Sequence, residues 1–355
     1  MKKATSLLLL SLFLGQTFAC TTFFLNKNGQ LVFGRNYDWL TDAGMVCTNV
    51  RGISKTSSAV KDGDTISWLS KYGSITFNQY GKEYPTGGMN ENGLVVELMW
   101  ADGSRYPDKD NRPALNVLQW VQYQLDNCQT VEEVIATNET LRISQDNPPL
   151  HYLVADAKGN VATIEFFEGK AVVHKGQDLP FPVLTNSPYS VSAQTATDAK
   201  VSSGNTSFSF QDNSLQRFTT ACSMVQQFQS TDVQKPTVDF AFDILQSVSQ
   251  PDFTKWSIVY DLQNKQIFFK TASATNIKTI AFSSLDLSCS GGSMAADMNM
   301  KSIKGDFQKQ LKPFTDKINR AIMERSANES RSQINITQSE IDASVAYANG
   351  IRCKS

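Results

Sequence analysis

A chain of 355 residues is long for one compact core, although large enzymes built on β-sheets reach this size as single domains. Hydrophobic residues make up 41% and charged residues 19% of the chain, which is ordinary for a globular protein and excludes wholesale disorder. The 33 basic and 34 acidic residues nearly cancel, so the charge favours binding to neither nucleic acid nor an anionic membrane.

The first 19 residues have the three parts of a secretory signal peptide. Lys2 and Lys3 precede the apolar run TSLLLLSLFL, and small residues at positions 17 and 19 mark a cleavage site before Cys20. The run is shorter than the roughly 20 apolar residues needed to span a bilayer. We therefore expect residues 1–19 to be removed and the protein to be exported, periplasmic or secreted, without membrane contact. A retained membrane anchor is the alternative.

A β-hairpin is predicted directly after the cleavage site. The runs CTTFFL and QLVFGRNYDW are apolar and rich in aromatic residues, and Asn28-Gly29 between them is a strong hairpin-turn signal. Cleavage before Cys20 would therefore place a cysteine with a free amine at the start of a strand.

Further hairpins and helices follow along the chain. Strands are predicted in HYLVADAKGNVATIEFF, WSIVYDL, KQIFFKT and IKTIAFSSLDL, and the first of these segments turns at Lys158 to Asn160. Helical patterns occupy residues 114–128, 130–141, 213–229 and 237–250, and the second opens with a capping box from Thr130 to Glu133. Because the strands come in hairpins, we expect an α+β protein with antiparallel sheets and helices outside them.

The remaining segments are predicted from their composition. Residues 192–214 are small and polar and are expected to form a loop. Residues 301–320 are rich in lysine with apolar residues at helical spacing, which favours a solvated helix face. The Ser-, Asn- and Gln-rich tail after them is an added helix, a dimer contact or partly disordered. The expected organisation is one catalytic domain over residues 20–289 and an extension over residues 290–355, packed on the same domain.

Six cysteines are scattered along the chain without a CxxC pair or a spacing typical of a zinc site, at Cys20, Cys47, Cys128, Cys222, Cys289 and Cys353. No metal site is expected. If Cys20 stays free, the five others cannot all pair within the chain. A bridge from Cys289 to Cys353 would tie down the C-terminal tail, but the sequence does not establish it.

The chemistry of the chain must be sought outside the common hydrolase motifs. There is no GxSxG elbow, HExxH motif or Walker loop, and both histidines, His151 and His174, lie in strand-like contexts typical of structural histidines. An N-terminal Cys20 supplies its own base. Its α-amine has an ordinary pKa of about 7.7 to 8.0, and the ordinary pKa of its thiol is about 8.5. Removal of the leader would then also activate the enzyme.

Two other roles for Cys20 remain open. A lipoprotein would carry a lipid on this cysteine and serve as an anchored, non-catalytic binding protein. The lipid-attachment motif favours Leu at the third position before the cysteine, where this chain has Thr17, and Phe18 is bulky for the next. A buried structural cysteine is the second alternative.

Four motifs in order resemble the choloylglycine hydrolase family of N-terminal-nucleophile amidases, which includes bile salt hydrolases and penicillin V acylases. They are CTTFFLNKNGQLVFGRNYDW, GGMNENGLVVELMW, VLTNSPYS and SLQRF, and the similarity covers roughly residues 20–287. The resemblance implies a four-layer αββα sandwich, often assembled as a homotetramer, that hydrolyses a linear non-peptide amide and needs no cofactor.

The resemblance also implies a catalytic set of Cys20, Arg35, Asp38, Asn186 and Arg217. Arg35 would favour the Cys20 thiolate, and Asp38 would accept a hydrogen bond from the α-amine. Asn186 would donate its amide to the oxyanion, and Arg217 would tie the group together. Singly, these residues also fit a strand-end ion pair, a turn asparagine and a surface arginine.

One departure from the family concerns the substrate. Bile salt hydrolases of the Gram-positive type carry an oxyanion-hole Asn where this chain has Trp100, so a backbone N–H or another donor must replace it. Trp39 and Trp100 instead resemble an aromatic pair in Gram-negative penicillin V acylases, which also cleave acyl homoserine lactones, and would suit an aromatic or long acyl group. The alternative is that both are core tryptophans. Penicillin V, acyl homoserine lactones and conjugated bile salts all remain candidate substrates.

Overall fold

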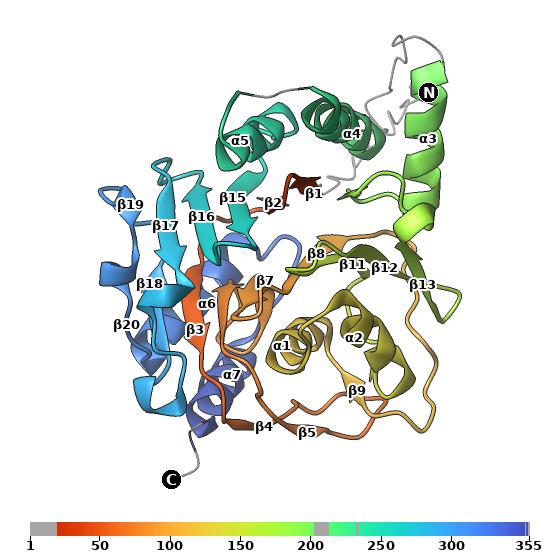
Figure 1. Ribbon diagram of the computed structural model, residues 1–355. Coiled ribbons are helices and arrows are strands. Elements are labelled where there is room, and N and C mark those ends of the chain that lie inside the picture. The colour runs from red at the N-terminus through yellow and green to blue at the C-terminus, as the bar shows by residue number, and fades with distance from the viewer. Residues whose placement is uncertain (1–19, 202–212, 232–233, 352, 354–355) are drawn as a thin grey trace, which may run out of the picture.

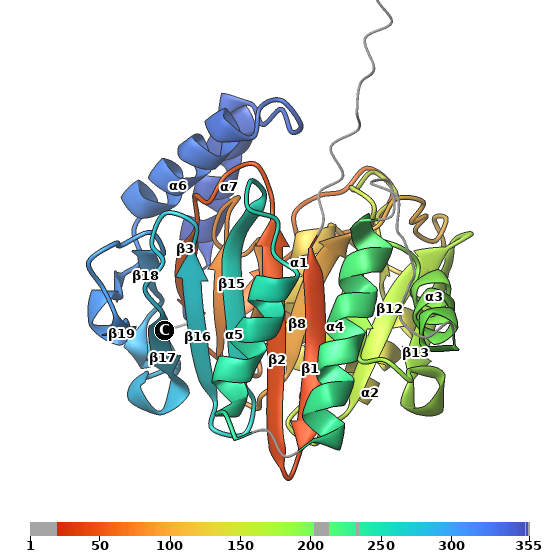
Figure 2. The ribbon, with the colours of Figure 1, turned by 90° about the horizontal axis from the view of Figure 1, so that it is seen from above.

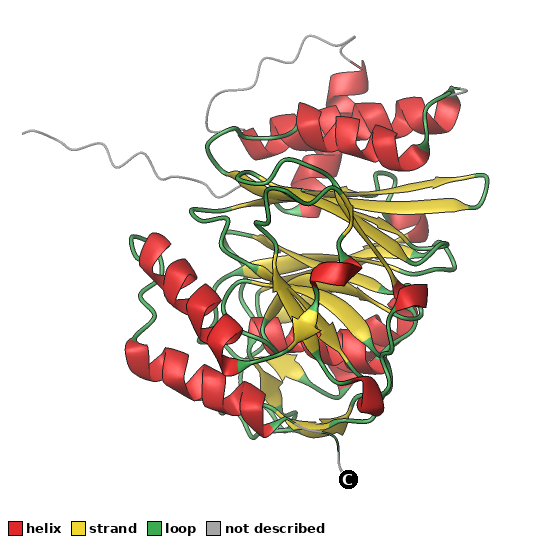
Figure 3. Ribbon diagram, turned by 90° about the vertical axis from the view of Figure 1, so that its left-hand side faces the viewer, coloured by secondary structure: helices red, strands yellow, loops and turns green. Residues whose placement is uncertain are grey.

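The fold is a sandwich of two β-sheets that face each other, with helices on both outer faces (Figures 1 and 3). The computed structural model describes residues 20–201, 213–231, 234–351 and 353. Sheets and helices therefore form the predicted αββα layers, and the expected fold class is confirmed. Within the described ranges, no helix is both long and apolar enough to cross a bilayer.

The first sheet has seven strands, antiparallel except for the short pair β17 and β19. Their spatial order is β14 (Val183–Leu184), β1 (Thr21–Lys27), β2 (Gln30–Asp38), β15 (Thr254–Asp261), β16 (Gln266–Thr271), β17 (Lys278–Ala281) and β19 (Gly305–Asp306). The helices on its outer face are α3 (Tyr189–Val201), α4 (Asn213–Ser230) and α5 (Thr237–Ser247), and Figure 2 shows α4 and α5 lying along β1 and β2.

The second sheet has nine antiparallel strands. Their order is β13 (Lys170–Lys175), β12 (Val161–Phe167), β11 (Leu150–Ala155), β8 (Val95–Trp100), β7 (Pro85–Asn90), β6 (Ser74–Asn78), β3 (Met45–Asn49), β18 (Met294–Asp297) and β20 (Lys312–Pro313). Helices α1 (Val117–Asn127) and α2 (Val131–Ala136) cover it, and α6 (Asp316–Glu329) packs on β18 beside α7 (Gln338–Gly350). Two small sheets pair β4 (Ser54–Thr56) with β5 (Ser67–Leu69) and β9 (Ala114–Leu115) with β10 (Arg142–Ile143).

The predicted first hairpin is present. Strands β1 and β2 pair from Thr21 opposite Asn36 to Lys27 opposite Gln30, and both turn residues, Asn28 and Gly29, have positive φ, at 54° and 77°. That geometry requires Asn and Gly because other side chains clash with the backbone there. The predicted hairpin around Lys158 to Asn160 is also found, between β11 and β12.

Capping is only partly as predicted. Thr130 caps α2 by accepting a bond from the Glu133 N–H at 3.3 Å, but the Glu133 carboxylate accepts from the Gln129 N–H, so the box is not reciprocal. Helix α5 begins at Thr237 behind Pro236 and has no side-chain cap.

The expected loop at residues 192–214 is wrong for its first part, because residues up to Val201 continue helix α3. The hydroxyls of Thr195 and Thr197 each donate a hydrogen bond to the backbone carbonyl four residues earlier, at 2.9 Å. Ala196 is buried in the main core, and α3 packs against α4. Tertiary packing therefore outweighs the weak helix propensity of the segment. Residues 202–212 of the expected loop lie outside the described part.

The expected helix at residues 301–320 is also wrong over most of its length. Residues 301–315 form the short strands β19 and β20 and a single turn of 3₁₀ helix, and α6 begins only at Asp316. Gly305 has a φ of 72°, and Pro313 cannot donate to a helix ladder, so a continuous helix is excluded.

The C-terminal tail is an added helix, α7, and a disulfide secures its end. Cys289 and Cys353 are bonded, with their Cα atoms 5.7 Å apart across 64 residues of sequence. Cys20, Cys47, Cys128 and Cys222 take no part in a disulfide, and all four are buried. The bridge that the sequence left open is therefore made.

A buried cluster of charges supports the loop between β6 and β7. Lys55 lies 2.6 Å from Glu83 and 2.9 Å from Asp126, and Lys82 pairs with the same Glu83. All four side chains are at least 96% buried. Glu83 adopts a φ of 73°, which is unfavourable for a residue with a side chain, so the two lysines hold the loop in a strained conformation.

We expect Lys55→Met to lower the free energy of unfolding by about 3 to 5 kcal/mol, because it leaves the buried Asp126 carboxylate without its cation and Glu83 with Lys82 alone. Urea unfolding at neutral pH measures this change. Lys61→Met is the matched control, since Lys61 is 85% exposed and pairs with Asp146 at 3.0 Å; it should change the value by less than about 1 kcal/mol. Equal effects of the two variants would contradict the structural role of the cluster.

Candidate functional site

The ends of several strands meet at one place between the two sheets. Cys20 immediately precedes β1, and Asp38 ends β2, its antiparallel neighbour. Strand β14, which pairs with the other edge of β1, ends two residues before Asn186. Because antiparallel neighbours bring the start of one strand beside the end of the next, residues distant in sequence converge around Cys20.

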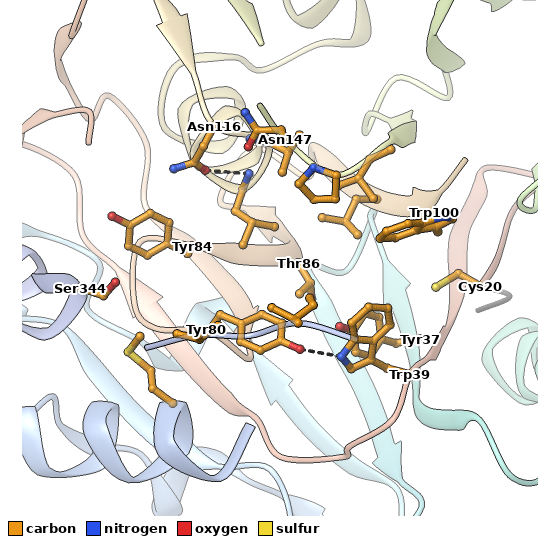
Figure 4. Close-up of a pocket in the computed structure, with 18 of the residues that line it drawn as sticks. Cys20, Tyr37, Trp39, Tyr80, Tyr84, Thr86, Trp100, Asn116, Asn147 and Ser344 are labelled. Carbon is orange, nitrogen blue, oxygen red and sulfur yellow. Dashed lines mark hydrogen bonds between the residues drawn. The ribbon is translucent and has the colours of Figure 1, made fainter. Parts of the chain in front are cut away.

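A cavity of about 420 Å³ opens beside Cys20 (Figure 4). Four of the seven site residues predicted from the sequence line it, namely Cys20, Asp38, Trp39 and Trp100. The other three do not line it but bond to residues that do: Arg35 to Leu98, Asn186 to Trp100 and Arg217 to Cys20. A cavity of this size with mainly apolar walls is typical of a small-molecule site.

The Cys20 thiol is nearly enclosed. Its residue is 3% exposed, and Sγ lies 4.0 Å from the backbone carbonyl oxygen of Asp38. Burial raises the pKa of the thiol above its ordinary value, although Arg35 and Arg217 act in the opposite direction. The expected effect of Arg35 on the thiolate is therefore present but outweighed. An attack by this sulfur at neutral pH needs a nearby base.

One oxygen of the Asp38 carboxylate is available to accept a further hydrogen bond. Its Oδ2 accepts a bond from the Gln250 side chain at 3.3 Å, whereas Oδ1 is buried and has no hydrogen-bond partner among the described residues. Burial raises the pKa of Asp38 to about 6, against the opposing charge of Arg217. A buried acceptor without a donor is costly and marks a place where a donor group is expected.

Arg35 does not pair with Asp38; it forms an ion pair with Glu97 of β8. Both side chains are completely buried, and Tyr260 also donates to Glu97. Room for the Glu97 carboxylate comes from Gly87 of β7, since a Cβ there would lie 1.9 Å from Glu97 Oε2. The sequence reasoning missed Glu97, although a single charge in the apolar strand GLVVELMW was a signal.

Arg217 of α4 joins three parts of the site. One guanidinium nitrogen donates to the Cys20 carbonyl at 2.7 Å and to the Thr21 hydroxyl at 2.5 Å, and the other donates to Asn186 Oδ1 at 2.9 Å. Arg217 is only 5% exposed, so it is not a surface arginine. These charge-assisted bonds fix the start of β1 relative to the turn that carries Asn186.

Asn186 is held by its neighbours on both sides. Its Nδ2 donates to the backbone carbonyl of Trp100 at 2.7 Å, and its backbone N–H donates to Ser214 Oγ at 3.0 Å. One of the two side-chain N–H groups is thus already used. Because the partner at position 100 is a main-chain carbonyl, Trp can occupy that position without loss of the contact. Ser214, in the SLQRF motif, was not identified from the sequence as a site residue.

The two tryptophans face one another in the cavity wall, with ring centroids 6.3 Å apart. The Trp39 indole N–H donates to Tyr80 Oη at 2.6 Å, and the Trp100 indole N–H donates to Asp102 at 2.6 Å. Each ring is therefore fixed in orientation while its apolar face remains available to the cavity.

His151 is structural, as the sequence indicated. It is fully buried on β11, and its ring nitrogens lie 3.0 Å from Glu165 Oε1 and 2.6 Å from the Thr185 carbonyl. His174 of β13 lies 3.7 Å from the same Glu165, and its ring packs against Tyr189 with centroids 4.8 Å apart. Neither histidine lines the cavity beside Cys20.

Comparison with known proteins places this geometry among amidases. Residues 20–295 match the family of linear amide C-N hydrolases known as the choloylglycine hydrolase family. Penicillin V acylase from Pectobacterium atrosepticum is 27% identical over 82% of this chain and 88% of its own. The structure of penicillin V acylase from Agrobacterium tumefaciens is 28% identical, with a TM-score of 0.71 over 83% of this chain and 98% of the other.

A second solved structure is similar in fold alone. It is a mutant of the conjugated bile acid hydrolase from Clostridium perfringens, 19% identical, with a TM-score of 0.64. The match covers 81% of this chain and 98% of that one.

The Asp38 carboxylate should make the stability of the uncleaved chain depend on pH. Its folded-state pKa is raised from 3.8 to about 6, so the folded chain binds this proton more tightly than the unfolded chain does. The resulting stability is present below the unfolded value and is lost as the pH rises through 6. In the uncleaved chain, the free energy of unfolding of Asp38→Asn should therefore rise by about 2 kcal/mol relative to that of wild type as the pH increases from about 4 to about 7.

Urea unfolding at the two pH values measures this difference. A wild type and an Asp38→Asn variant with parallel pH profiles would contradict the raised pKa of Asp38.

Proposed function

Because the chain belongs to the choloylglycine hydrolase family and is a linear amide C-N hydrolase, we propose that Cys20, freed by cleavage, is its nucleophile. The observation that carries this proposal is the pairing of a buried thiol with a buried acceptor at one end of an apolar cavity. Cys20 and Asp38 both line the cavity, and Asp38 Oδ1 has no donor among the described residues. An α-amine created at Cys20 would supply that donor.

The first step transfers the acyl group to sulfur. The free α-amine takes the thiol proton as Sγ attacks the amide carbon, which gives a tetrahedral oxyanion. Asp38 orients the resulting ammonium, and the unused N–H of Asn186 donates to the oxyanion. The α-ammonium then protonates the leaving nitrogen, the C–N bond breaks, and a thioester on Cys20 remains.

The second step releases the acid. The same α-amine, now neutral, takes a proton from water, and the hydroxide attacks the thioester carbon. The sulfur leaves and takes the proton back from the ammonium, which restores the starting state. Arg217 holds Cys20 and Asn186 in fixed positions through both steps. In both steps the α-amine of Cys20 accepts the proton and then passes it on.

The acyl group of the substrate is proposed to be aromatic or long and apolar. Support comes from the Trp39 and Trp100 rings in the cavity wall and from the similarity to two penicillin V acylases. Penicillin V, N-acyl homoserine lactones and conjugated bile salts all have such acyl groups. The leaving amine should be small and polar, because the apolar walls favour the acyl side.

The mature protein is proposed to be exported. Two observations support this proposal. Residues 1–19 have the pattern of a signal peptide that ends directly before Cys20. The Cys289–Cys353 disulfide is also of a kind that persists in oxidising compartments outside the cytoplasm.

Intact mass and N-terminal analysis of the exported protein should find an unmodified Cys20 as the first residue. Cys20→Ser should mature at the same position and lose at least about 10³-fold in amide hydrolysis, because the nucleophile is removed. Cys128→Ser, at another buried free cysteine, should keep wild-type activity. A diacylglyceryl adduct on Cys20, a different first residue or an active Cys20→Ser variant would refute the mechanism.

Trp100→Ala should lower kcat/KM for aromatic or long-chain acyl amides by roughly 10- to 100-fold, because a stacking face of the cavity is lost. Acetyl or propionyl amides with the same leaving amine should change only about twofold, since the backbone contact to Asn186 stays. Trp100→Phe should restore most of the aromatic activity. An equal loss over all acyl groups would indicate a structural tryptophan instead.

A further inference from the structure

The end of the cavity remote from Cys20 is built by the C-terminal helical hairpin, defined as α6, α7 and their connection. Its lining residues are Met323, Ile334, Ile336, Glu340 and Ser344. In Figure 4, Ser344 and Cys20 lie at opposite ends of the drawn lining residues. All five hairpin residues lie beyond residue 295, where the match to the family ends. A segment outside that match therefore closes the cavity that the catalytic residues open.

The hairpin is a rigid unit. Met323 and Ala327 of α6 form a small core with Ile341 and Val345 of α7. Arg320 pairs with Asp342 at 2.5 Å across the two helices. A wall fixed in this way can restrict what enters the cavity, whereas a loose tail would yield to the ligand.

The C-terminal end of the hairpin is also fastened to the rest of the protein. The disulfide at Cys353 ties the end of α7 to Cys289. Tyr347 of α7 donates to the Thr56 carbonyl at 2.8 Å and accepts from Gln119 of α1 at 2.9 Å. Figure 2 shows both helices beside the end of β3, on one side of the sandwich.

Direct bonds connect the hairpin with the aromatic wall near Cys20. Tyr80, which holds the Trp39 indole, donates its own hydroxyl to Ser330 Oγ at 3.1 Å. Thr41, two residues after Trp39, donates to Glu329 at the end of α6. The position of the Trp39 ring therefore depends on the hairpin as well as on β2.

The two ends of the cavity differ in chemistry. The Cys20 end has the thiol beside Tyr37, Trp39 and Trp100, whereas the far end has the Ser344 hydroxyl and the Glu340 carboxylate beside Tyr84 and aliphatic side chains. Glu340 accepts bonds from the Thr337 backbone N–H and hydroxyl, both at 2.7 Å, and these bonds lower the pKa of its carboxyl. A negative charge at the far end disfavours an acyl group that ends in an anion.

We propose that the C-terminal hairpin is the distal subsite for the acyl group, with Ser344 at the position that limits acyl length. This inference rests on the proposed amidase function, because it assumes that the acyl carbon lies at Cys20 and that the chain extends along the cavity. It assigns to the extension a part in substrate selection in addition to packing on the domain.

The test compares two leucine substitutions one residue apart on α7. Ser344 lines the cavity, whereas Ala343 is exposed and does not. A panel of straight-chain acyl amides of increasing length, all with one leaving amine, gives kcat/KM for each length. Ser344→Leu should lower kcat/KM at least about tenfold for the longest acyl groups that wild type accepts, and leave the shortest unchanged. Ala343→Leu should keep the wild-type profile throughout.

Ile336→Ala provides a second variant with the opposite expectation. Removing part of the Ile336 side chain enlarges the far end, so the length profile should shift towards longer acyl groups. Thermal unfolding of each variant checks that the fold is kept. Length profiles in Ser344→Leu and Ile336→Ala that match wild type would overturn the proposal.

Failure of the amidase mechanism would be recognised separately. Binding of the free carboxylic acids to Cys20→Ser, measured by calorimetry, gives Kd against acyl length without any turnover. If Ser344→Leu in that background selectively weakens the longer acids, the subsite is supported even if no amide in the panel is hydrolysed. If amides are hydrolysed but Kd and kcat/KM are unchanged at every length, the subsite is refuted while the mechanism stands.

Discussion

A buried ion pair between Arg35 and Glu97 joins the two sheets beside the Cys20 thiol, and the arrangement of the site depends on it. Arg35 belongs to β2 of the seven-stranded sheet, and Glu97 belongs to β8 of the nine-stranded sheet. Arg35 also donates to the Leu98 carbonyl at 3.1 Å. Two charges removed from water are tolerated only when fully paired, so the pair sets how the sheets lie against one another at this point.

Burial at the site also disfavours the ionised forms of the Cys20 thiol and the Asp38 carboxyl. Burial raises the pKa of the Cys20 thiol, and it raises that of Asp38 to about 6. A thiol that keeps its proton needs a base next to it, and a buried carboxylate oxygen without a donor needs a hydrogen-bond partner. In the proposed mechanism, an α-amine created at Cys20 by cleavage would meet both needs at once.

The cavity beside Cys20 is assembled from nearly the whole length of the chain. Cys20 comes from its beginning, Trp100 from β8, and Ser344 from the last helix. The family match covers the residues at the Cys20 end and stops before those of the far end. This division fits the two proposals, because the chemistry at the amide would be shared by all substrates while the acyl groups would differ.

Local signals in the sequence determined the features that depend on neighbouring residues. Asn28-Gly29 specified the first hairpin through its backbone conformation, and the signal-peptide pattern of residues 1–19 is the basis for proposing Cys20 as the nucleophile. Only the tertiary structure decided the remainder, because those features depend on contacts between distant segments. Packing against α4 makes a helix of the polar residues before Val201. Glu97 is brought beside Arg35 by the facing sheet, and Ser344 is brought to the cavity by the packing of the C-terminal hairpin. No local sequence pattern predicts either position.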